Sequence, residues 1–156
     1  MGKEFGNMLP MINRKCMIHE TESVTKAEII EKMVKLFDAE GYLEDIDVFH
    51  EDILAREDVF STYIGFGIGL PHGKSKAVKE AGIAVAKLDH SVLWDEENGE
   101  SVEMILMIAV KAGEGADLHL QVLSKLSRML MHEEFRDELK NSGLDELQTL
   151  LVEKLS

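Results

Sequence analysis

The chain has 156 residues, of which 45% are hydrophobic, and this is the size and composition of one compact domain. It carries 30 acidic and 17 basic residues, giving a formal net charge of −13. Such a charge repels nucleic acid and anionic membranes, which argues against nucleic-acid binding. The charge either keeps the protein in solution or steers basic protein partners toward it, and composition leaves both open.

The sequence gives no sign of a membrane segment or a disulfide framework. No apolar run approaches the roughly 18 residues of a membrane-spanning helix, and the first residues lack the ordered regions of a secretory signal. We therefore expect a cytoplasmic protein without direct membrane insertion. Cys16 is the only cysteine, so no internal disulfide can form and a structural zinc site is not indicated.

The N-terminal part predicts a strand followed by a helix. Residues 1–15 show no clear period and are expected to be an irregular segment, with a short strand at Cys16–His19. Thr25, followed three residues later by Glu28, is a capping-box signature, and apolar residues then keep helical spacing up to Gly41.

The middle of the chain changes from helical to extended patterns. A second helical pattern begins at Ile46 and is expected to dissolve near Arg56–Asp58. Ile64–Leu70 and Gly82–Leu88 are expected to be extended. Val102–Val110 is a nearly unbroken apolar run, which is typical of a strand buried on both faces.

The C-terminal third returns to helical spacing in residues 118–130, 135–139 and 144–151. Helical patterns therefore lie on both sides of the extended region in the sequence. We expect a single α/β domain over residues 16–156, with a β-sheet flanked by helices on both faces.

The glycine-rich segment before His72 does not have the pattern of a phosphate-binding loop. Gly65, Gly67 and Gly69 are spaced by two, but Leu70 stands where a dinucleotide fingerprint needs its third glycine, and no complete P-loop pattern follows. In an extended segment these glycines would leave one face bare, which is typical of close approach by a helix, another backbone or a ligand.

Pro71 fixes its own backbone and favours an extended conformation in Leu70, so we expect the strand to end there and His72 to begin the exit loop. Gly73 leaves the imidazole unobstructed. The residues alone leave two interpretations open: His72 is merely exposed, or it is presented for chemistry.

The other histidines differ in their surroundings. His119 opens an apolar helix, and a helix N-terminus favours anions. A metal pair of His72 and His119 is conceivable, but no third ligand is obvious. Four histidines lie among charged or boundary residues and are interpreted as surface residues: His19, His50, His90 and His132.

No hydrolase nucleophile is evident, which leaves histidine itself. An imidazole can attack a phosphoryl group when one ring nitrogen has a free lone pair and the other is held as a donor. The phosphoryl charge then needs donors such as arginine, backbone amides or a second imidazole.

One segment resembles the active-site signature of the fructose/mannitol-type (type 2) enzyme IIA domains of the bacterial phosphoenolpyruvate-dependent sugar phosphotransferase system (PTS). Gly69 stands where the family usually has alanine, and both residues are small. The resemblance extends from about residue 20 to the end of the chain. The residues that comply with the signature are Glu57, Ile64, Gly65, Ile68, Leu70, Pro71, His72 and Gly73.

The resemblance implies roles for individual residues. His72 would be the phosphoryl-accepting nucleophile, His119 would help to hold the phosphoryl group, and Arg56 would neutralise its charge. Thr62 and Gly73 would support the site from the adjoining segments. The resemblance implies a mixed sheet. It implies no metal, nucleotide or other cofactor.

The resemblance also implies partners. The phosphocarrier protein HPr would donate the phosphoryl group and a IIB component would accept it, while the membrane component IIC would be involved only indirectly. The alternative is a nitrogen-regulatory module that binds target proteins according to its phosphorylation state. Lys74, Lys76 and Lys79 either offset charge near His72 or form a solvated helix face.

Overall fold

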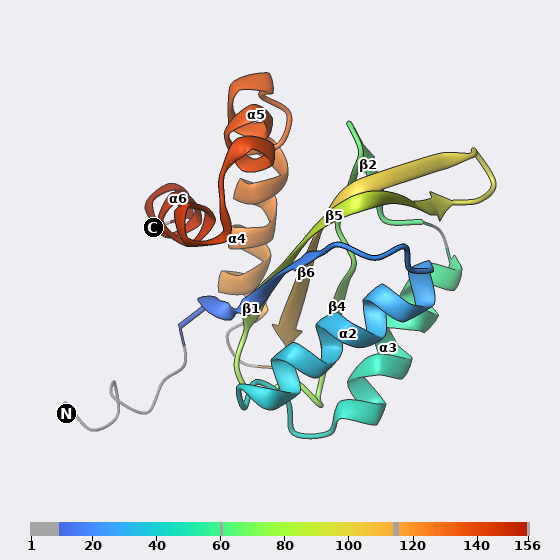
Figure 1. Ribbon diagram of the computed structural model, residues 1–156. Coiled ribbons are helices and arrows are strands. Elements are labelled where there is room, and N and C mark those ends of the chain that lie inside the picture. The colour runs from blue at the N-terminus through green and yellow to red at the C-terminus, as the bar shows by residue number, and fades with distance from the viewer. Residues whose placement is uncertain (1–9, 60, 114–115, 156) are drawn as a thin grey trace.

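The protein is described by a computed structural model that covers residues 10–59, 61–113 and 116–155, with only the backbone at 116–120. One mixed sheet is covered by helices on both faces, so the predicted fold class is confirmed (Figure 1). Its elements are β1 (Ile12–Glu20), α2 (Lys26–Ala39), α3 (Ile46–Val59), β2 (Tyr63–Gly65), β3 (Ile68–Gly69), β4 (His72–Ser75), β5 (Gly82–Asp95), β6 (Glu100–Lys111), α4 (Ala116–Met129), α5 (Glu133–Asn141) and α6 (Leu144–Leu155).

The strands follow the order β1-β5-β6-β3-β2, and β4 pairs with β6 beyond the end of β3. Strands β5 and β6 form a long antiparallel hairpin, whereas β1 is parallel to β5. Both β3 and β4 are parallel to β6. One side of β6 is therefore lined first by β3 and then by β4, with Leu70 and Pro71 between them.

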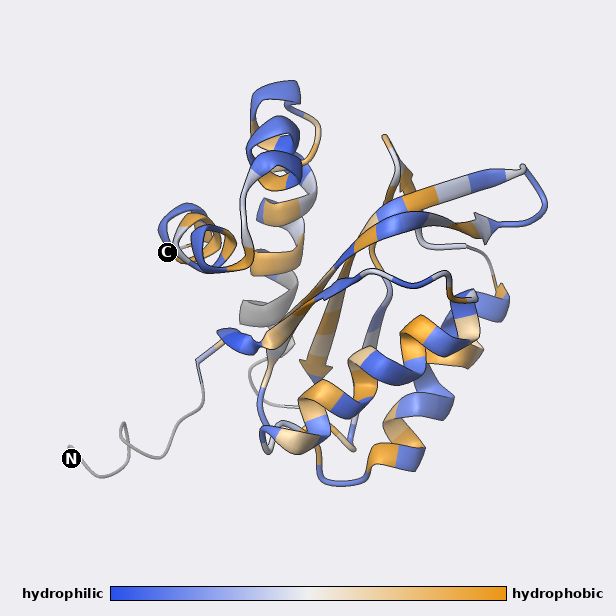
Figure 2. Cartoon of the chain, viewed as in Figure 1, coloured by the Kyte–Doolittle hydropathy of each residue, from blue (hydrophilic) through white to orange (hydrophobic). Residues whose placement is uncertain are grey.

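Strand β6 is buried on both faces, as its apolar run predicted. Side chains on one face pack with α2 and α3, and those on the other face pack with α4, α5 and α6. Figure 2 shows hydrophobic colour along the central strands where they pass between the helical layers. The two sets alternate along the strand, with Ile105, Met107 and Ala109 in the first and Met104, Leu106, Ile108 and Val110 in the second.

The predicted N-terminal elements are present. Strand β1 begins at Ile12, four residues before the expected strand. The capping box is confirmed, because the Thr25 side chain accepts a hydrogen bond from the Glu28 backbone and the Glu28 side chain accepts one from the Thr25 backbone.

The second helix ends close to the predicted position, just after Asp58. Helix α3 continues to Val59, so Arg56 and Glu57 lie within it. Its buried positions are Phe49, Ile53 and Glu57, which are spaced by four residues and form one helix face. The apolar pattern ends before Glu57 because the last residue of this face is a carboxylate.

The prediction of one extended segment at Ile64–Leu70 was wrong. Strands β2 and β3 form a tight hairpin whose two turn residues, Phe66 and Gly67, have φ of 59° and 75°. Positive φ at both positions is the geometry that turns two neighbouring strands back on each other. The glycines therefore do not share one bare face. The expected close approach occurs at Gly69, where an added Cβ would lie 2.9 Å from Cε2 of Trp94.

We expect Gly69→Ala to destabilise the protein by about 1–3 kcal/mol, which is typical of overpacking in a core. The Trp94 ring is 1% exposed and its Nε1 donates to Thr62 Oγ1, so the ring has little room to move. Urea unfolding would measure the loss. Gly143→Ala is the matched control, because the nearest atom to its added Cβ is a flexible carboxylate oxygen at 3.5 Å. Equal stability of the two variants would contradict the prediction.

Candidate functional site

His72 is the first residue of β4, so the prediction that it begins an exit loop was wrong. Pro71 interrupts the strand, but the Ile108 backbone donates to the Pro71 carbonyl and pairing with β6 resumes at once. Among the described strands, β6 is the only neighbour of β4. His72 therefore lies at an edge of the sheet, where one flank has no strand beside it.

The His72 ring is oriented by the backbone just before it. Its Nδ1 lies 2.8 Å from the Leu70 carbonyl oxygen. A carbonyl oxygen only accepts, so Nδ1 carries the proton and donates. In the neutral imidazole this leaves the lone pair on Nε2, which is the arrangement that a nucleophilic histidine requires. The residue is half-buried.

The strand register tells which face His72 occupies. His72 pairs with Ile108, whose side chain belongs to the core under α4, α5 and α6. Laterally paired residues point to the same face of a sheet. His72 thus shares the face covered by α4, the helix that contains His119. The side chain of His119 lies outside the described part of the structure.

Gly73 points to the opposite face, toward α3. An added Cβ at Gly73 would lie 3.0 Å from Cδ1 of Ile53, so helix and strand are in direct contact there. Two positions further along β4, the Ser75 hydroxyl donates to Asp52 of α3 at 2.5 Å. The small residues of β4 therefore let α3 lie against it.

The same contacts locate Arg56. Asp52 contacts Ser75, and the next residue of α3, Ile53, contacts Gly73, which comes earlier in β4. Helix α3 and strand β4 therefore run in opposite directions. Arg56 follows Ile53 by three residues and is on the same side of the helix, one turn further on. Because the two elements run in opposite directions, a step of one turn along α3 from Ile53 leads from Gly73 toward His72 and Pro71. Arg56 is half-buried and has its own contacts in the fold.

Thr62 lies in a buried polar cluster beside this segment. The Glu57 carboxylate accepts hydrogen bonds from the Thr62 hydroxyl and from its backbone N–H, and Trp94 Nε1 donates to the same hydroxyl at 3.1 Å. The Thr62 hydroxyl therefore has both a donor and an acceptor partner within the fold. This geometry suits support of the site rather than direct contact with a ligand.

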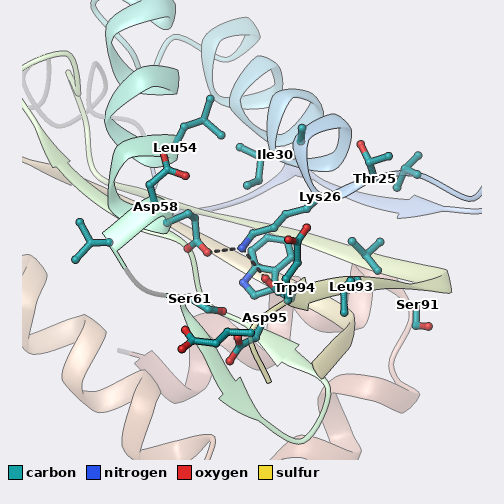
Figure 3. Close-up of a pocket in the computed structure, with 17 residues that line it drawn as sticks. Thr25, Lys26, Ile30, Leu54, Asp58, Ser61, Ser91, Leu93, Trp94 and Asp95 are labelled. Carbon is teal, nitrogen blue, oxygen red and sulfur yellow. Dashed lines mark hydrogen bonds and ion pairs between the residues drawn. The ribbon is translucent and has the colours of Figure 1, made fainter. Parts of the chain in front are cut away.

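A pocket of about 770 Å³ adjoins that cluster, and Figure 3 shows Lys26 and Trp94 side by side within it. His72 is not among the residues that line it. Five acidic residues line the pocket: Glu57, Asp58, Asp95, Glu96 and Glu97. The pocket and His72 are thus separate features, and Glu57, the hydrogen-bond partner of Thr62, lines the pocket.

Other groups considered from the sequence take structural or surface positions. Burial raises the pKa of the Cys16 thiol to about 12, so the thiol stays protonated at neutral pH. His19 pairs with Asp89 on the surface. Lys74, Lys76 and Lys79 are exposed, but they lie in β4 and the turn after it, so the helix-face alternative was wrong.

Within the described residues, no group of three or more His, Cys, Asp or Glu is arranged to hold a metal ion. Nor is any described helix long and apolar enough to cross a membrane.

A family model described as "Phosphoenolpyruvate-dependent sugar phosphotransferase system, EIIA 2" matches residues 10–154. The chain belongs to this family. It is a PTS EIIA domain of the fructose/mannitol type, as the signature around His72 predicted.

Curated relatives of this EIIA domain include a chain of similar size. The fructose-specific EIIA component of Haloferax volcanii is 38% identical over 120 residues, which are 77% of each chain. Multiphosphoryl transfer protein 2 of Escherichia coli is 31% identical over 147 residues, 94% of this chain. The EIIA domain spans only 17% of that protein, and 23% of the E. coli mannosyl-glycerate-specific EIIABC component.

Two solved structures support the same fold. The nitrogen regulatory protein IIA-Ntr of Neisseria meningitidis has a TM-score of 0.76 and 29% identity, covering 95% of this EIIA domain and 99% of that chain. The E. coli IIA-mannitol structure in complex with phosphorylated IIB-mannitol has a TM-score of 0.73 and 25% identity. The match covers 90% of this EIIA domain and 96% of that chain.

Proposed function

We propose that this EIIA domain is a phosphohistidine carrier that accepts a phosphoryl group from phospho-HPr on His72 and passes it to a IIB component during sugar uptake. The observation that carries the proposal is the hydrogen bond from His72 Nδ1 to the Leu70 carbonyl. It leaves Nε2 as the nucleophilic atom, within the signature of a family that transfers phosphoryl groups.

The transfer itself needs little covalent chemistry from the protein. The Nε2 lone pair forms a bond to phosphorus while the bond from phosphorus to the donor's nitrogen breaks, and that electron pair returns to the donor imidazole. The reverse sequence passes the group to the acceptor. Catalysis then consists of positioning and of charge stabilisation, for which Arg56, His119 and the backbone amides near Gly73 are the proposed groups.

Two findings support the proposed partners. The solved relative described as IIA-mannitol is in complex with phosphorylated IIB-mannitol, so an EIIA of this fold engages a IIB protein. The net charge of −13 favours a partner whose docking face is basic, and it fits HPr as the donor if HPr presents such a face. The exposed Lys74, Lys76 and Lys79 would offset that charge locally near His72.

A second candidate is favoured by one specific observation. IIA-Ntr of N. meningitidis has a TM-score of 0.76 to this domain and covers 95% of it, so a regulatory module shares the same frame. In that role the phosphorylation state of His72 would decide which target protein binds. The fructose-type relative at 38% identity favours the carrier role.

Phosphorylation in a purified system tests the proposal. The wild-type chain is incubated with phosphoenolpyruvate, enzyme I and HPr, and acid-labile phosphate on the chain is measured by mass spectrometry. We expect one phosphoryl group per chain, and none when HPr is omitted. An unmodified chain, in a reaction where a known EIIA is labelled, would overturn the proposal.

The same reaction separates the two candidate functions. Fructose-type and mannitol-type IIB proteins are added to the phosphorylated chain, and loss of its phosphate is followed over time. Transfer to a IIB protein supports the carrier role. Stable phosphate in the presence of every IIB tested would favour the regulatory role.

A further inference from the structure

We propose that Glu57 is a positioning residue for His72, and that it acts through Thr62 and Leu70. Glu57 is in α3, and its carboxylate contacts Thr62 and Lys26, so it acts on His72 through other residues and is not a catalytic residue. The inference rests on the proposed function only for its rate measurement. Its structural claim is that the Glu57 carboxylate holds the segment that orients the imidazole.

The first link joins Glu57 to Thr62. The carboxylate accepts from the Thr62 backbone N–H at 3.3 Å and from the Thr62 hydroxyl. Glu57 is 9% exposed and Thr62 is 6% exposed, so water has little access to either group. Two hydrogen bonds from one residue to one carboxylate fix both the backbone and the side chain of Thr62 relative to α3.

The second link holds the carboxylate in place. Lys26 Nζ lies 2.8 Å from Glu57 Oε1, and it also donates to the Trp94 carbonyl at 2.7 Å. The same ammonium lies 4.6 Å from the centroid of the Trp94 ring (Figure 3). A buried carboxylate without a partner is costly, and the ion pair with Lys26 offsets that cost. Glu57 is thereby tied to α2 and β5 as well as to α3.

The third link passes from Thr62 to His72 through a single residue. The Leu70 N–H donates to the Thr62 carbonyl at 3.0 Å, and the Leu70 carbonyl accepts from His72 Nδ1 at 2.8 Å. Leu70 is 3% exposed, and the following proline has a fixed φ. The direction of the Leu70 carbonyl therefore depends on where Thr62 is held, and the His72 tautomer depends on that carbonyl.

Removal of the Glu57 charge should accordingly loosen Thr62, turn the Leu70 carbonyl and let His72 sample the Nε2–H tautomer. That tautomer has no lone pair on the attacking nitrogen. A misplacement of about 1 Å at a reacting group can cost about 100-fold in rate. We expect Glu57→Gln to slow phosphorylation by about tenfold to 100-fold, without contact between Glu57 and the phosphoryl group.

The test compares Glu57→Gln with Glu20→Gln. Glu20 is a matched control, because it is 8% exposed, pairs with Lys32 and lies at the end of β1 away from β4. Long-range ¹H–¹⁵N NMR of the His72 ring gives the proportion of the two tautomers, urea unfolding gives stability, and phospho-HPr gives the transfer rate. We expect both variants to lose stability, and only Glu57→Gln to alter the tautomer ratio and the rate.

Thr62 supplies a second pair of variants in case Glu57→Gln does not fold. Thr62→Val removes the hydroxyl that Glu57 holds but keeps the shape, whereas Thr62→Ser keeps the hydroxyl. We expect the altered tautomer ratio in Thr62→Val and the wild-type ratio in Thr62→Ser. If the ratio in Glu57→Gln, or in Thr62→Val where Glu57→Gln does not fold, equals that of wild type, the inference is overturned. The NMR comparison needs no partner protein, so it remains decisive even if the wild-type chain is not phosphorylated.

Discussion

Replacement of His72 by alanine is expected to abolish phosphorylation of the chain, a loss of more than about 10³-fold, as with other removed nucleophiles. The reason is chemical: the proposed bond to phosphorus forms at Nε2, and no other group in the segment can replace that lone pair. His72 is half-buried at the sheet edge, and its ring donates a hydrogen bond to the Leu70 carbonyl. The fold should therefore tolerate the change, and circular dichroism should remain that of wild type.

His132→Ala is the control for this variant. His132 is exposed before α5 and makes no side-chain cap hydrogen bond, so its removal should change neither labelling nor stability. Mass spectrometry of a proteolytic digest would locate the phosphate on the wild-type chain. Labelling of His72→Ala at the wild-type rate would show that another residue is the acceptor.

The sheet and the helical layers of the fold could be predicted because the spacing of apolar residues shows which face of an element is buried. Strand β6 has apolar residues on both faces, and the structure packs its alternate side chains into two separate cores. Helix α2 combines a capping box with apolar residues at helical spacing, and both signals are local. Such elements need no knowledge of distant contacts.

The errors and omissions arose where distant contacts decide the local structure. Glu57 continues the buried face of α3 because Lys26 and Thr62 partner its carboxylate, and a pattern of apolar residues cannot detect that. The Phe66–Gly67 turn places a phenylalanine at φ 59°, a conformation that sequence rules assign to glycine or asparagine. The strand resumes after Pro71 because β6 offers a partner at that point.

In the candidate site, too, local sequence features could be predicted and features set by distant contacts could not. The Pro71–His72–Gly73 sequence left open whether His72 is merely exposed or presented for chemistry, and the resemblance to the family signature favoured the second interpretation. The ring nitrogen that carries the proton could not be predicted, because it depends on the direction of the Leu70 carbonyl. The hydrogen bond from Trp94 Nε1 to Thr62 Oγ1 could not be predicted either, because the two residues are 32 positions apart in the chain.

Arg56→Gln is expected to slow phosphoryl transfer to and from His72 by about 10²–10³-fold, the typical effect of removing one donor that stabilises transition-state charge. The transferred group carries negative charge on its equatorial oxygens, and the chain as a whole carries −13. Without a nearby cation, this surplus of carboxylates would repel the phosphoryl group. Arg56 follows the contact of α3 with Gly73 by one helical turn, toward the His72 end of β4. Because α3 covers the sheet face opposite to the His72 ring, the proposed role requires the guanidinium to reach the phosphoryl group at the open edge of the sheet.

Arg56→Lys and Arg14→Gln separate a positioned guanidinium from net charge. Lysine keeps the charge but cannot present the planar fork of arginine, so Arg56→Lys should recover only part of the rate. Arg14→Gln removes the same charge from β1, where Arg14 pairs with exposed Asp145, and it should transfer at the wild-type rate. Single-turnover rates with phospho-HPr would measure all three. If Arg14→Gln slowed transfer as much as Arg56→Gln, the acidic surface as a whole, and not a cation aimed at His72, would control the reaction.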